Sequence, residues 1–291
     1  MKITFFIGEF NGGGAERVIS ILANKMIEKD FDIEILKYHN TINSYETDSR
    51  IAINSVEENT NTRTNTIKNL KWMHNHFKQR DVIISFLAPF NILALVGNIG
   101  NKTPIIVADR NDPNRVPSKS YVRKIRNILY KTADKVVLQT EDNKKYFNYL
   151  SDKAIVIPNP IDMDDFVGEA IKANKNKKIV NVGRLESQKN QIMLINAFND
   201  LKDKYNDYQL VIYGEGSYRD ILQNEINKLG LNDRVSLFGE TNDIFNQIKD
   251  AELFVLNSDY EGMPNALAEA MACGLICVST DCQTGPRDLP P

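Results

Sequence analysis

Short runs of β-branched and aromatic residues alternate with longer stretches of helical periodicity along almost the whole chain. Near-continuous apolar runs of this length are typical of strands buried on both faces of a parallel sheet. They predict strands in two series, at residues 2–7, 32–37, 82–86, 104–108, 135–139 and 154–157, and then at 179–182, 209–213, 234–238, 253–256 and 275–279. Between them the periodicity predicts helices at 15–29, 67–79, 121–132, 191–204, 220–229 and 264–272. This alternation indicates an α/β protein.

The alternation is interrupted once, between Pro158 and Lys178. Pro158-Asn159-Pro160 is expected to form a rigid extended turn, and the polar stretch after it has no clear strand. We interpret this region as a linker and predict two sequential α/β domains, residues 1–165 and 166–291. The length of 291 residues, about twice that of a typical domain, agrees with two domains.

Composition excludes several classes of protein. Hydrophobic residues make up 42% and charged residues 25%, which is too apolar for a disordered chain. No apolar run approaches the ~20 residues of a membrane span, and the apolar start of the chain is too short for a secretory leader. The three cysteines, Cys273, Cys277 and Cys282, lie close together without a CxxC pair, which excludes a disulfide scaffold and favours the reducing cytoplasm.

Charge is unevenly distributed along the chain. Residues 1–165 carry 23 basic and 20 acidic side chains, whereas residues 166–291 carry 13 and 18. Two stretches of the first half, 59–80 and 113–133, contain basic residues and no acidic ones. A slightly acidic chain without a recognition motif is a poor candidate for nucleic-acid binding.

The basic stretch at 121–133 has two interpretations. Its apolar side chains recur at helical spacing and its basic ones occupy much of the remaining circumference; the two sets are Val122, Ile125 and Leu129, and Arg123, Lys124, Arg126 and Lys131. The helix either packs on the sheet with a solvated basic face or rests that face on anionic lipid. In the second case an apolar wedge beside Lys68, Lys71 and Lys78 would add to the contact, formed by Trp72, Met73 and Phe77.

Three glycines, Gly12, Gly13 and Gly14, follow the first predicted strand and open the first helix. They allow a ligand to approach the backbone, and the helix start presents free N–H groups to an anion. The spacing is not GxGxxG, and no acidic residue ends the second strand, so a nicotinamide or flavin site is a poor fit. A tight turn without a ligand remains the alternative.

Two loops of the second domain carry the most informative residues. Arg184 and Lys189 bracket a turn after the strand at 179–182, where two cations can neutralise a departing diphosphate, although a solvated surface pair is the alternative. Glu261 lies in a later strand-to-helix loop and Glu269 on the helix that follows. Two carboxylates so placed can hold separate hydroxyl groups of one ligand while the helix start faces its phosphates. The alternative for Glu269 is an ordinary exposed helical position.

Glu261 and Glu269 match the E-x7-E motif of the family 4 (GT4, glycogen-synthase-like) retaining glycosyltransferases, which this chain resembles over essentially its whole length. Other blocks resemble the family's in the family's order: Gly12–Arg17, Ile157–Asp162, Gly183–Asn190, Tyr213–Gly216, Phe238-Gly239 and Ser258–Gly262. The resemblance implies a GT-B fold, in which two Rossmann-like domains face each other across a cleft. The first domain would bind the acceptor and the second a nucleotide sugar, expected to be UDP-linked, without a metal or other cofactor.

The resemblance also implies roles for individual residues. Arg184 and Lys189 would bind the donor diphosphate, Glu269 the ribose and Glu261 the transferred sugar; these make Arg184, Lys189 and Glu261 the expected catalytic residues. Gly13 and Gly14 would approach the donor phosphates and the acceptor, and Gly262, Met263 and Asn265 would complete the donor site. Retention would proceed by departure and attack on one face, with a phosphate oxygen assisting the incoming hydroxyl. Asp162-Met163-Asp164 mimics a metal-binding DxD but is expected to be structural.

Two departures from the family pattern matter. A histidine common after the fourth strand is replaced by Asp109-Arg110-Asn111-Asp112-Pro113, which makes Arg110 a candidate substrate-binding residue, whereas His39, His74 and His76 are expected on the surface or on helices. The chain also ends where the family continues for another strand and several helices, so we expect an incomplete second domain with an uncovered sheet edge. We would expect a lengthened chain to be more stable and more active.

The overall expectation is a cytoplasmic enzyme, peripheral on the inner face of the membrane. It would transfer a hexose or N-acetylhexosamine to a lipid-linked glycan in the biosynthesis of a surface polysaccharide or lipopolysaccharide. The alternative is a non-catalytic sugar-nucleotide-binding or assembly subunit derived from such an enzyme.

Overall fold

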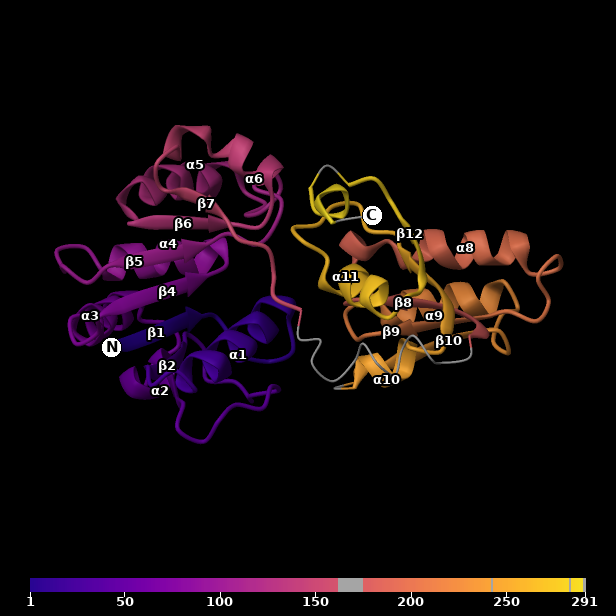
Figure 1. Cartoon of the computed structure of the whole chain (residues 1–291), viewed down its shortest axis with the longest axis horizontal. Coiled ribbons are helices and arrows are strands. Elements are labelled where there is room, and N and C mark those ends of the chain that lie inside the picture. Colours follow the sequence, from indigo (N-terminus) through magenta and orange to yellow (C-terminus); the bar gives the residue numbers. More distant parts are fainter. Residues whose placement is uncertain (162–174, 242, 283, 290–291) are drawn as a thin grey trace. The chain divides into compact units, whose positions relative to one another are not determined.

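The structure, a computed structural model, describes residues 1–161 and 175–289 except 242 and 283. Two compact units divide the chain, Met1–Pro160 and Ile161–Pro291, each built around its own parallel sheet (Figure 1). The prediction of an α/β protein with two parallel sheets is confirmed.

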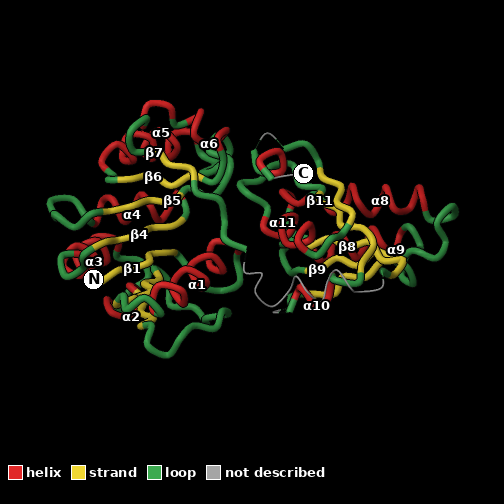
Figure 2. The backbone as a smooth tube through the Cα atoms, viewed as in Figure 1, coloured by secondary structure: helices red, strands yellow, loops and turns green. Residues whose placement is uncertain are grey.

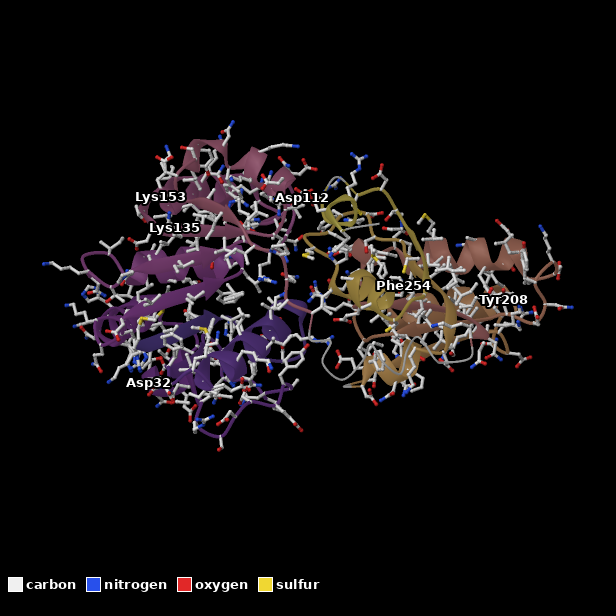
Figure 3. The ribbon with its side chains drawn as sticks, in the orientation of Figure 1. Asp32, Asp112, Lys135, Lys153, Tyr208 and Phe254 are labelled. Carbon is white, nitrogen blue, oxygen red and sulfur yellow. The ribbon has the colours of Figure 1, made fainter. Side chains whose placement is uncertain are left out.

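Seven parallel strands form the sheet of the first unit, in the order β3-β2-β1-β4-β5-β6-β7. The strands are β1 (Lys2–Ile7), β2 (Asp32–Lys37), β3 (Ala52–Ser55), β4 (Val82–Phe86), β5 (Ile105–Ala108), β6 (Lys135–Leu138) and β7 (Ala154–Val156). The helices are α1 (Gly14–Ile27), α2 (Val56–Thr60), α3 (Thr66–Phe77), α4 (Ala88–Gly97), α5 (Ser120–Leu129) and α6 (Glu141–Tyr146), with 3₁₀ turns η1 (Tyr130–Thr132) and η2 (Asn148–Leu150). Figure 3 shows Asp32 and Lys135, which begin β2 and β6, at the amino ends of the strands. Asp112 lies on the opposite side, at the carboxyl ends of the strands.

Alternation along β1 divides the core of the first unit between the two faces of its sheet. Phe6 packs on one face, where its ring centroid lies 6.0 Å from that of Phe77 on α3. Phe5 belongs to the other cluster, together with Val18 and Ile19 of α1. Side chains of neighbouring strand residues point to opposite faces, so both faces need a helical cover.

Five parallel strands form the sheet of the second unit, in the order β10-β9-β8-β11-β12. Figure 2 shows strands of this unit in yellow and its helices in red. The strands are β8 (Asn176–Val182), β9 (Gln209–Tyr213), β10 (Val235–Gly239), β11 (Ala251–Leu256) and β12 (Ile276–Ser279). The helices are α8 (Gln191–Leu201), α9 (Arg219–Lys228), α10 (Ile244–Ile248) and α11 (Asn265–Ala272), with 3₁₀ turns η3 (Ser187–Lys189) and η4 (Pro286–Asp288). One apolar cluster joins this sheet to α8 and α9 and another joins it to α10 and α11, and Phe254 of β11, labelled in Figure 3, lies in the second.

Sequence patterns located the eleven predicted strands to within a few residues and missed β3, α2, α4, α6 and α10. Helix α4 was missed because its sequence, APFNILALVG, is apolar almost all round and lacks the amphipathic period. Strand β8 begins at Asn176, inside the stretch predicted to be linker.

The prediction that Trp72, Met73 and Phe77 of α3 form an apolar wedge for contact with a membrane is wrong. Met73 and Phe77 are fully buried in the core of the first unit, and the half-buried Trp72 stacks on His76 with 4.5 Å between ring centroids. Met73 and Phe77 face the sheet because α3 needs them to cover it, so these two side chains cannot also contact a membrane.

A buried carboxylate, Glu34 on β2, ties α3 to the sheet. Its oxygens accept hydrogen bonds from Thr4 Oγ1 at 2.6 Å, Asn54 Nδ2 at 2.9 Å and Arg80 Nη2 at 3.2 Å, and pair with His76 Nε2 at 2.9 Å. Burial by itself raises the pKa of Glu34, but the hydrogen bond and charge of His76 and the bonds from Thr4 and Asn54 hold it at about 2.

Glu34 is therefore expected to make the first unit acid-sensitive. A carboxyl group whose pKa is lower in the folded state stabilises the fold above its unfolded pKa, and this stabilisation is lost as pH falls toward the folded pKa. We expect the unfolding free energy of the first unit to fall by an amount on the order of 3 kcal/mol between pH 5 and pH 2 because of Glu34. The chain has one tryptophan, Trp72, so its fluorescence during urea unfolding reports this unit.

The Glu34→Gln variant should have a lower unfolding free energy at pH 7, and this free energy should fall less steeply between pH 5 and pH 2 than in wild type. Replacing the exposed Glu28 by Gln should change neither the unfolding free energy at pH 7 nor its dependence on pH. An equally steep acid dependence in Glu34→Gln would contradict this account.

Candidate functional site

In the sheet of the second unit, the direction in which the chain adds successive strands reverses between β8 and β11. From β8 the chain continues to β9 and β10 on one side, and from β11 it continues to β12 on the other. The loops after these two neighbouring strands, residues 183–190 and 257–264, therefore begin side by side at the carboxyl ends of the strands and lead to opposite sides of the sheet. Open α/β sheets bind their ligands at such a switch point.

Lys189 and Glu261 meet across this switch point. Lys189 Nζ lies 2.5 Å from Glu261 Oε1, although 72 residues separate them in the sequence. Ser258 Oγ donates to the same oxygen at 2.6 Å. Glu261 is buried and Lys189 mostly so, which strengthens their interaction relative to a pair in water. Oε2 of Glu261 makes no hydrogen bond with a described residue, so this oxygen can accept one from a ligand hydroxyl.

Side-chain and backbone hydrogen bonds join the two loops around this pair. Asn257 Nδ2 donates to the carbonyl of Lys189 at 2.7 Å, and Gln188 Nε2 to that of Tyr260 at 2.8 Å. The backbone N–H of Asp259 donates to the carbonyl of Gln188 at 2.9 Å. Because polar groups of each loop are satisfied by the other, the two loops hold Lys189 and Glu261 in a defined geometry.

Glycines allow close approach at two places in this site. A Cβ added to Gly183 would lie 3.3 Å from Cδ of Lys189, so the lysine side chain lies along the backbone of its own loop. Gly214, with a φ of +137°, begins the loop after β9, and a Cβ there would lie 2.1 Å from the carbonyl oxygen of Gly183. The loops after β8 and β9 thus pack backbone against backbone.

Arg184 and Glu269 are not part of the Lys189–Glu261 pair. Arg184 is largely exposed, and its Nη1 lies 3.2 Å from Glu186 Oε1. Glu269 is half-buried on α11, which begins at Asn265 directly after Pro264. Gly262 is buried, whereas Met263 and Asn265 are half-buried at the start of α11. The predicted donor-site residues thus all lie on the two loops and on α11.

The sequence interpretation assigned no role to three residues that support Glu261 or its loop. Ser258 binds the carboxylate of Glu261, Thr284 Oγ1 donates to the backbone carbonyl of Glu261, and Asn181 Nδ2 donates to Asn257 Oδ1 at 3.0 Å. Gly285 has a φ of +97° and packs on the carbonyl of Gly262. The Gly285-Pro286 dipeptide was the available signal for this turn.

The first unit has its own switch point between β1 and β4, where the glycine cluster lies. Gly13 precedes α1 and Gly14 begins it, and Tyr45 Oη donates to the carbonyl of Gly13 at 3.0 Å. A Cβ on Gly13 would lie 2.1 Å from a carboxylate oxygen of Glu16. The side chain of Glu16 therefore folds back over the start of the helix, the end that carries a partial positive charge.

Arg110 follows β5, two strands from the glycine cluster. Its guanidinium donates to Asn159 Oδ1 and lies 5.3 Å from the ring centroid of Phe86. Burial lowers the pKa of Arg110 to about 10, although the charge of Glu16 opposes this shift. Arg110 and the start of α1 thus lie within electrostatic reach of each other at the carboxyl edge of this sheet.

One of the three histidines, His39, lies at the carboxyl ends of the strands of the first unit, where it follows β2 and its backbone N–H donates to the carbonyl of Gly8, after β1, at 2.9 Å. His74 and His76 are on α3, and the partly exposed His39 contacts Glu57 at 2.8 Å. Across residues 1–161 and 175–289, leaving aside 242 and 283, no three His, Cys, Asp or Glu side chains gather as they would around a metal ion. Asp162-Met163-Asp164 lies outside the described residues. None of the described helices is both long and apolar enough to cross a bilayer.

Comparison with known proteins relates the chain to enzymes that transfer sugars. A family profile described as glycosyl transferases group 1 matches residues 162–289. The chain is 30% identical over 308 residues to the N-acetylgalactosamine-N,N'-diacetylbacillosaminyl-diphospho-undecaprenol 4-alpha-N-acetylgalactosaminyltransferase of Campylobacter jejuni, covering 99% of this chain and 83% of the relative. It is 33% identical over 220 residues to a glycosyltransferase of Methanocaldococcus jannaschii, covering 70% of this chain and 54%, about half, of that relative's length.

Solved structures show the same fold. S. aureus TarM, solved in complex with fondaparinux, alpha-GlcNAc-glycerol and UDP, superposes with a TM-score of 0.82 over 99% of this chain and 87% of its own, at 14% identity. At this identity the likeness concerns the fold alone, and it confirms the predicted GT-B architecture.

Proposed function

This chain belongs to the group 1 glycosyltransferases, and from that premise we propose a retaining family 4 enzyme that moves a hexose or N-acetylhexosamine from a UDP-sugar to a lipid-linked glycan. The lipid-linked acceptor is supported by the name of the Campylobacter relative, which specifies a diphospho-undecaprenol carrier. The UDP donor is supported by the UDP held in TarM. The observation that carries the proposal is the Lys189–Glu261 pair at the switch point of the second unit.

In the proposed reaction the bond between the anomeric carbon and the β-phosphate oxygen breaks, and the acceptor hydroxyl bonds to that carbon on the same face. The departing diphosphate gains negative charge, which Lys189 and Arg184 would neutralise. The proton of the acceptor hydroxyl passes to a phosphate oxygen. These two cations supply the charge that a divalent metal supplies elsewhere, so the proposal includes no metal.

The two carboxylates would orient the donor. Oε1 of Glu261 is held by Lys189 and Ser258, which directs Oε2 toward hydroxyl groups of the transferred sugar. Glu269 would accept hydrogen bonds from the ribose hydroxyls, and Gly262, Met263 and Asn265 would line the path between ribose and sugar. Gly13, Gly14 and Arg110 of the first unit are proposed to bind the acceptor and the donor phosphates.

The proposal predicts separate effects on binding and on transfer. Glu269→Gln should weaken UDP binding about tenfold, because charge-assisted hydrogen bonds to the ribose become neutral ones. Isothermal titration with UDP measures the change. Glu225→Gln on α9 is the matched control, since Glu225 is also a half-buried helical glutamate. Equal weakening of UDP binding in the two variants would contradict the assignment of Glu269 to the ribose.

The deciding experiment incubates the full chain with a panel of UDP-sugars and diphospho-undecaprenol-linked glycans and identifies products by mass spectrometry. A product one hexose or one N-acetylhexosamine heavier is expected. Binding of UDP without turnover for every donor and acceptor would instead select the alternative, a non-catalytic sugar-nucleotide-binding or assembly subunit.

A further inference from the structure

Helix α5 presents an apolar surface to solvent where a basic one was expected. Tyr121, Ile125 and Ile128 have exposed fractions of 57%, 45% and 65%, and Lys124 lies exposed among them. These positions recur at i, i+3, i+4 and i+7, which places them on one side of a helix. We call these four residues the α5 outer face. Exposed aliphatic and aromatic side chains grouped in this way mark interaction surfaces.

Arg126 is the reason that these apolar side chains face outward. Its side chain is 0% exposed, and its guanidinium donates to the carbonyls of Val116 at 2.6 Å and Pro113 at 3.0 Å. It also lies 3.6 Å from the buried carboxylate of Asp109. Because Arg126 occupies the inward position, Ile125 and Ile128 turn to the opposite side. The expectation that Arg126 is solvated and Ile125 buried is therefore wrong.

Cationic side chains surround the α5 outer face. Lys119 Nζ lies 5.9 Å from the ring centroid of Tyr121, before the helix, and Lys131 Nζ lies 5.6 Å from that of Tyr149, after it. Lys119 and Lys131 are exposed, and Tyr149 is 40% exposed. The stretch from Pro113 to Ala133 contains no acidic residue. The surface thus combines apolar and aromatic groups with lysines and no acidic side chain of its own segment.

We propose that the α5 outer face, with Lys119, Lys131 and Tyr149, docks the first unit on an anionic lipid bilayer. Ile125 and Ile128 would insert among the upper acyl carbons, Tyr121 and Tyr149 would lie at the headgroup level, and the lysines would contact anionic headgroups. Charge complementarity selects lipid, because the three charged side chains that form part of this surface, Lys119, Lys124 and Lys131, are exposed cations that can reach a headgroup. The inference rests on the proposed function, since a lipid-linked acceptor is available only at a membrane surface.

Vesicle binding of the full chain tests this surface without any sugar. Wild type is expected to co-sediment with vesicles of phosphatidylglycerol and phosphatidylcholine at low salt, and to stay in solution with phosphatidylcholine alone. Ile125→Ser with Ile128→Ser should lower the partition coefficient roughly tenfold. Lys124→Gln with Lys131→Gln should lower it by roughly fivefold per lysine, and added salt should reduce the difference.

A matched control uses α3, the other candidate basic helix. Ile67 is 81% exposed there and is followed by the exposed Lys68, so Ile67→Ser with Lys68→Gln removes similar groups from another face of the same unit. This variant should bind vesicles like wild type. The proposal is overturned if wild type ignores anionic vesicles, if the α3 variant loses binding as the α5 variants do, or if wild type binds neutral and anionic vesicles equally.

A second readout separates this proposal from the proposed function. Hydrolysis of UDP-sugars by the chain in free solution should be unchanged in the α5 variants, and urea unfolding followed by Trp72 fluorescence confirms that they are folded. Hydrolysis that persists while wild type fails to bind vesicles overturns only the docking surface. Vesicle binding that depends on α5 in a chain that neither hydrolyses nor transfers sugar overturns only the enzymatic assignment.

Discussion

Replacing Lys189 by alanine is expected to lower the kcat of sugar transfer by about 10²–10³-fold. The contact of its ammonium group with Glu261 at 2.5 Å holds the end of the Lys189 side chain, and the hydrogen bond from Asn257 to the backbone carbonyl of Lys189 holds its loop. A cation that needs no reorganisation stabilises the charge that develops on the departing diphosphate more than the charge of the bound donor. The effect should therefore appear mainly in kcat, with a smaller change in KM.

Lys178→Ala is the matched control for this experiment. Lys178 lies on β8 and also forms an ion pair, with Asp250 at 2.7 Å. Its side chain is 20% exposed, compared with 18% for Lys189, but it lies on the strand, away from the loop that follows it. Its kcat should stay near that of wild type. Similar losses in the two variants would indicate a general effect of breaking an ion pair and would exclude Lys189 from the reaction.

Replacing Arg126 by leucine is expected to cost the first unit about 3–5 kcal/mol of unfolding free energy. The substitution leaves Asp109 buried without its cation and leaves the carbonyls of Pro113 and Val116 without their donor. Burial already raises the pKa of Asp109, while Arg126 and the hydrogen bond from Tyr130 oppose that rise. Without Arg126 the carboxyl group should therefore be protonated at higher pH.

Urea unfolding at pH 7, followed by Trp72 fluorescence, measures the loss. Arg123→Leu on the same helix is the control, because Arg123 is half-buried and, among the described residues, donates to the carbonyls of Pro117 and Ser118 and to no carboxylate. It should cost about 1 kcal/mol or less. Adding Asp109→Asn to Arg126→Leu should recover part of the stability by removing the unpaired charge. No recovery in the double variant would show that the carbonyl bonds, and not the charge pair, dominate.

Arg126 also shows where prediction from sequence failed. Residues 121–133 have a helical period, and the helix was predicted correctly, but the period alone assigned Arg126 to water and Ile125 to the core. A side chain with five donors can be buried when carbonyls and a carboxylate converge on it. Pro113, Val116 and Asp109 supply those acceptors from positions 10 to 17 residues away, on a loop whose path the sequence does not specify.

The loops of the candidate site were better predicted than their contacts. Gly183, Pro264 and the strands before them indicated two turns at strand ends, and both lie where expected. The roles of Lys189 and Glu261 came from the family resemblance, and spacing along the chain gave no sign that they touch. Ser258 lies in a block that resembles the family and Thr284 does not, but nothing in the sequence indicated that the buried hydroxyl groups of these two residues hold Glu261.

By itself the sequence indicated eleven of the strands, most of the longer helices and the α/β class, because strand and helix periods are set by interactions between residues a few positions apart. It determined the two-domain α/β organisation and the family by the order of its motifs. Only the tertiary structure decided which side chains meet: Lys189 with Glu261, Arg126 with Asp109, and Glu34 with His76. These contacts join residues 17 to 72 positions apart, and burial and hydrogen bonding select them only after the strands have taken their order in the sheets.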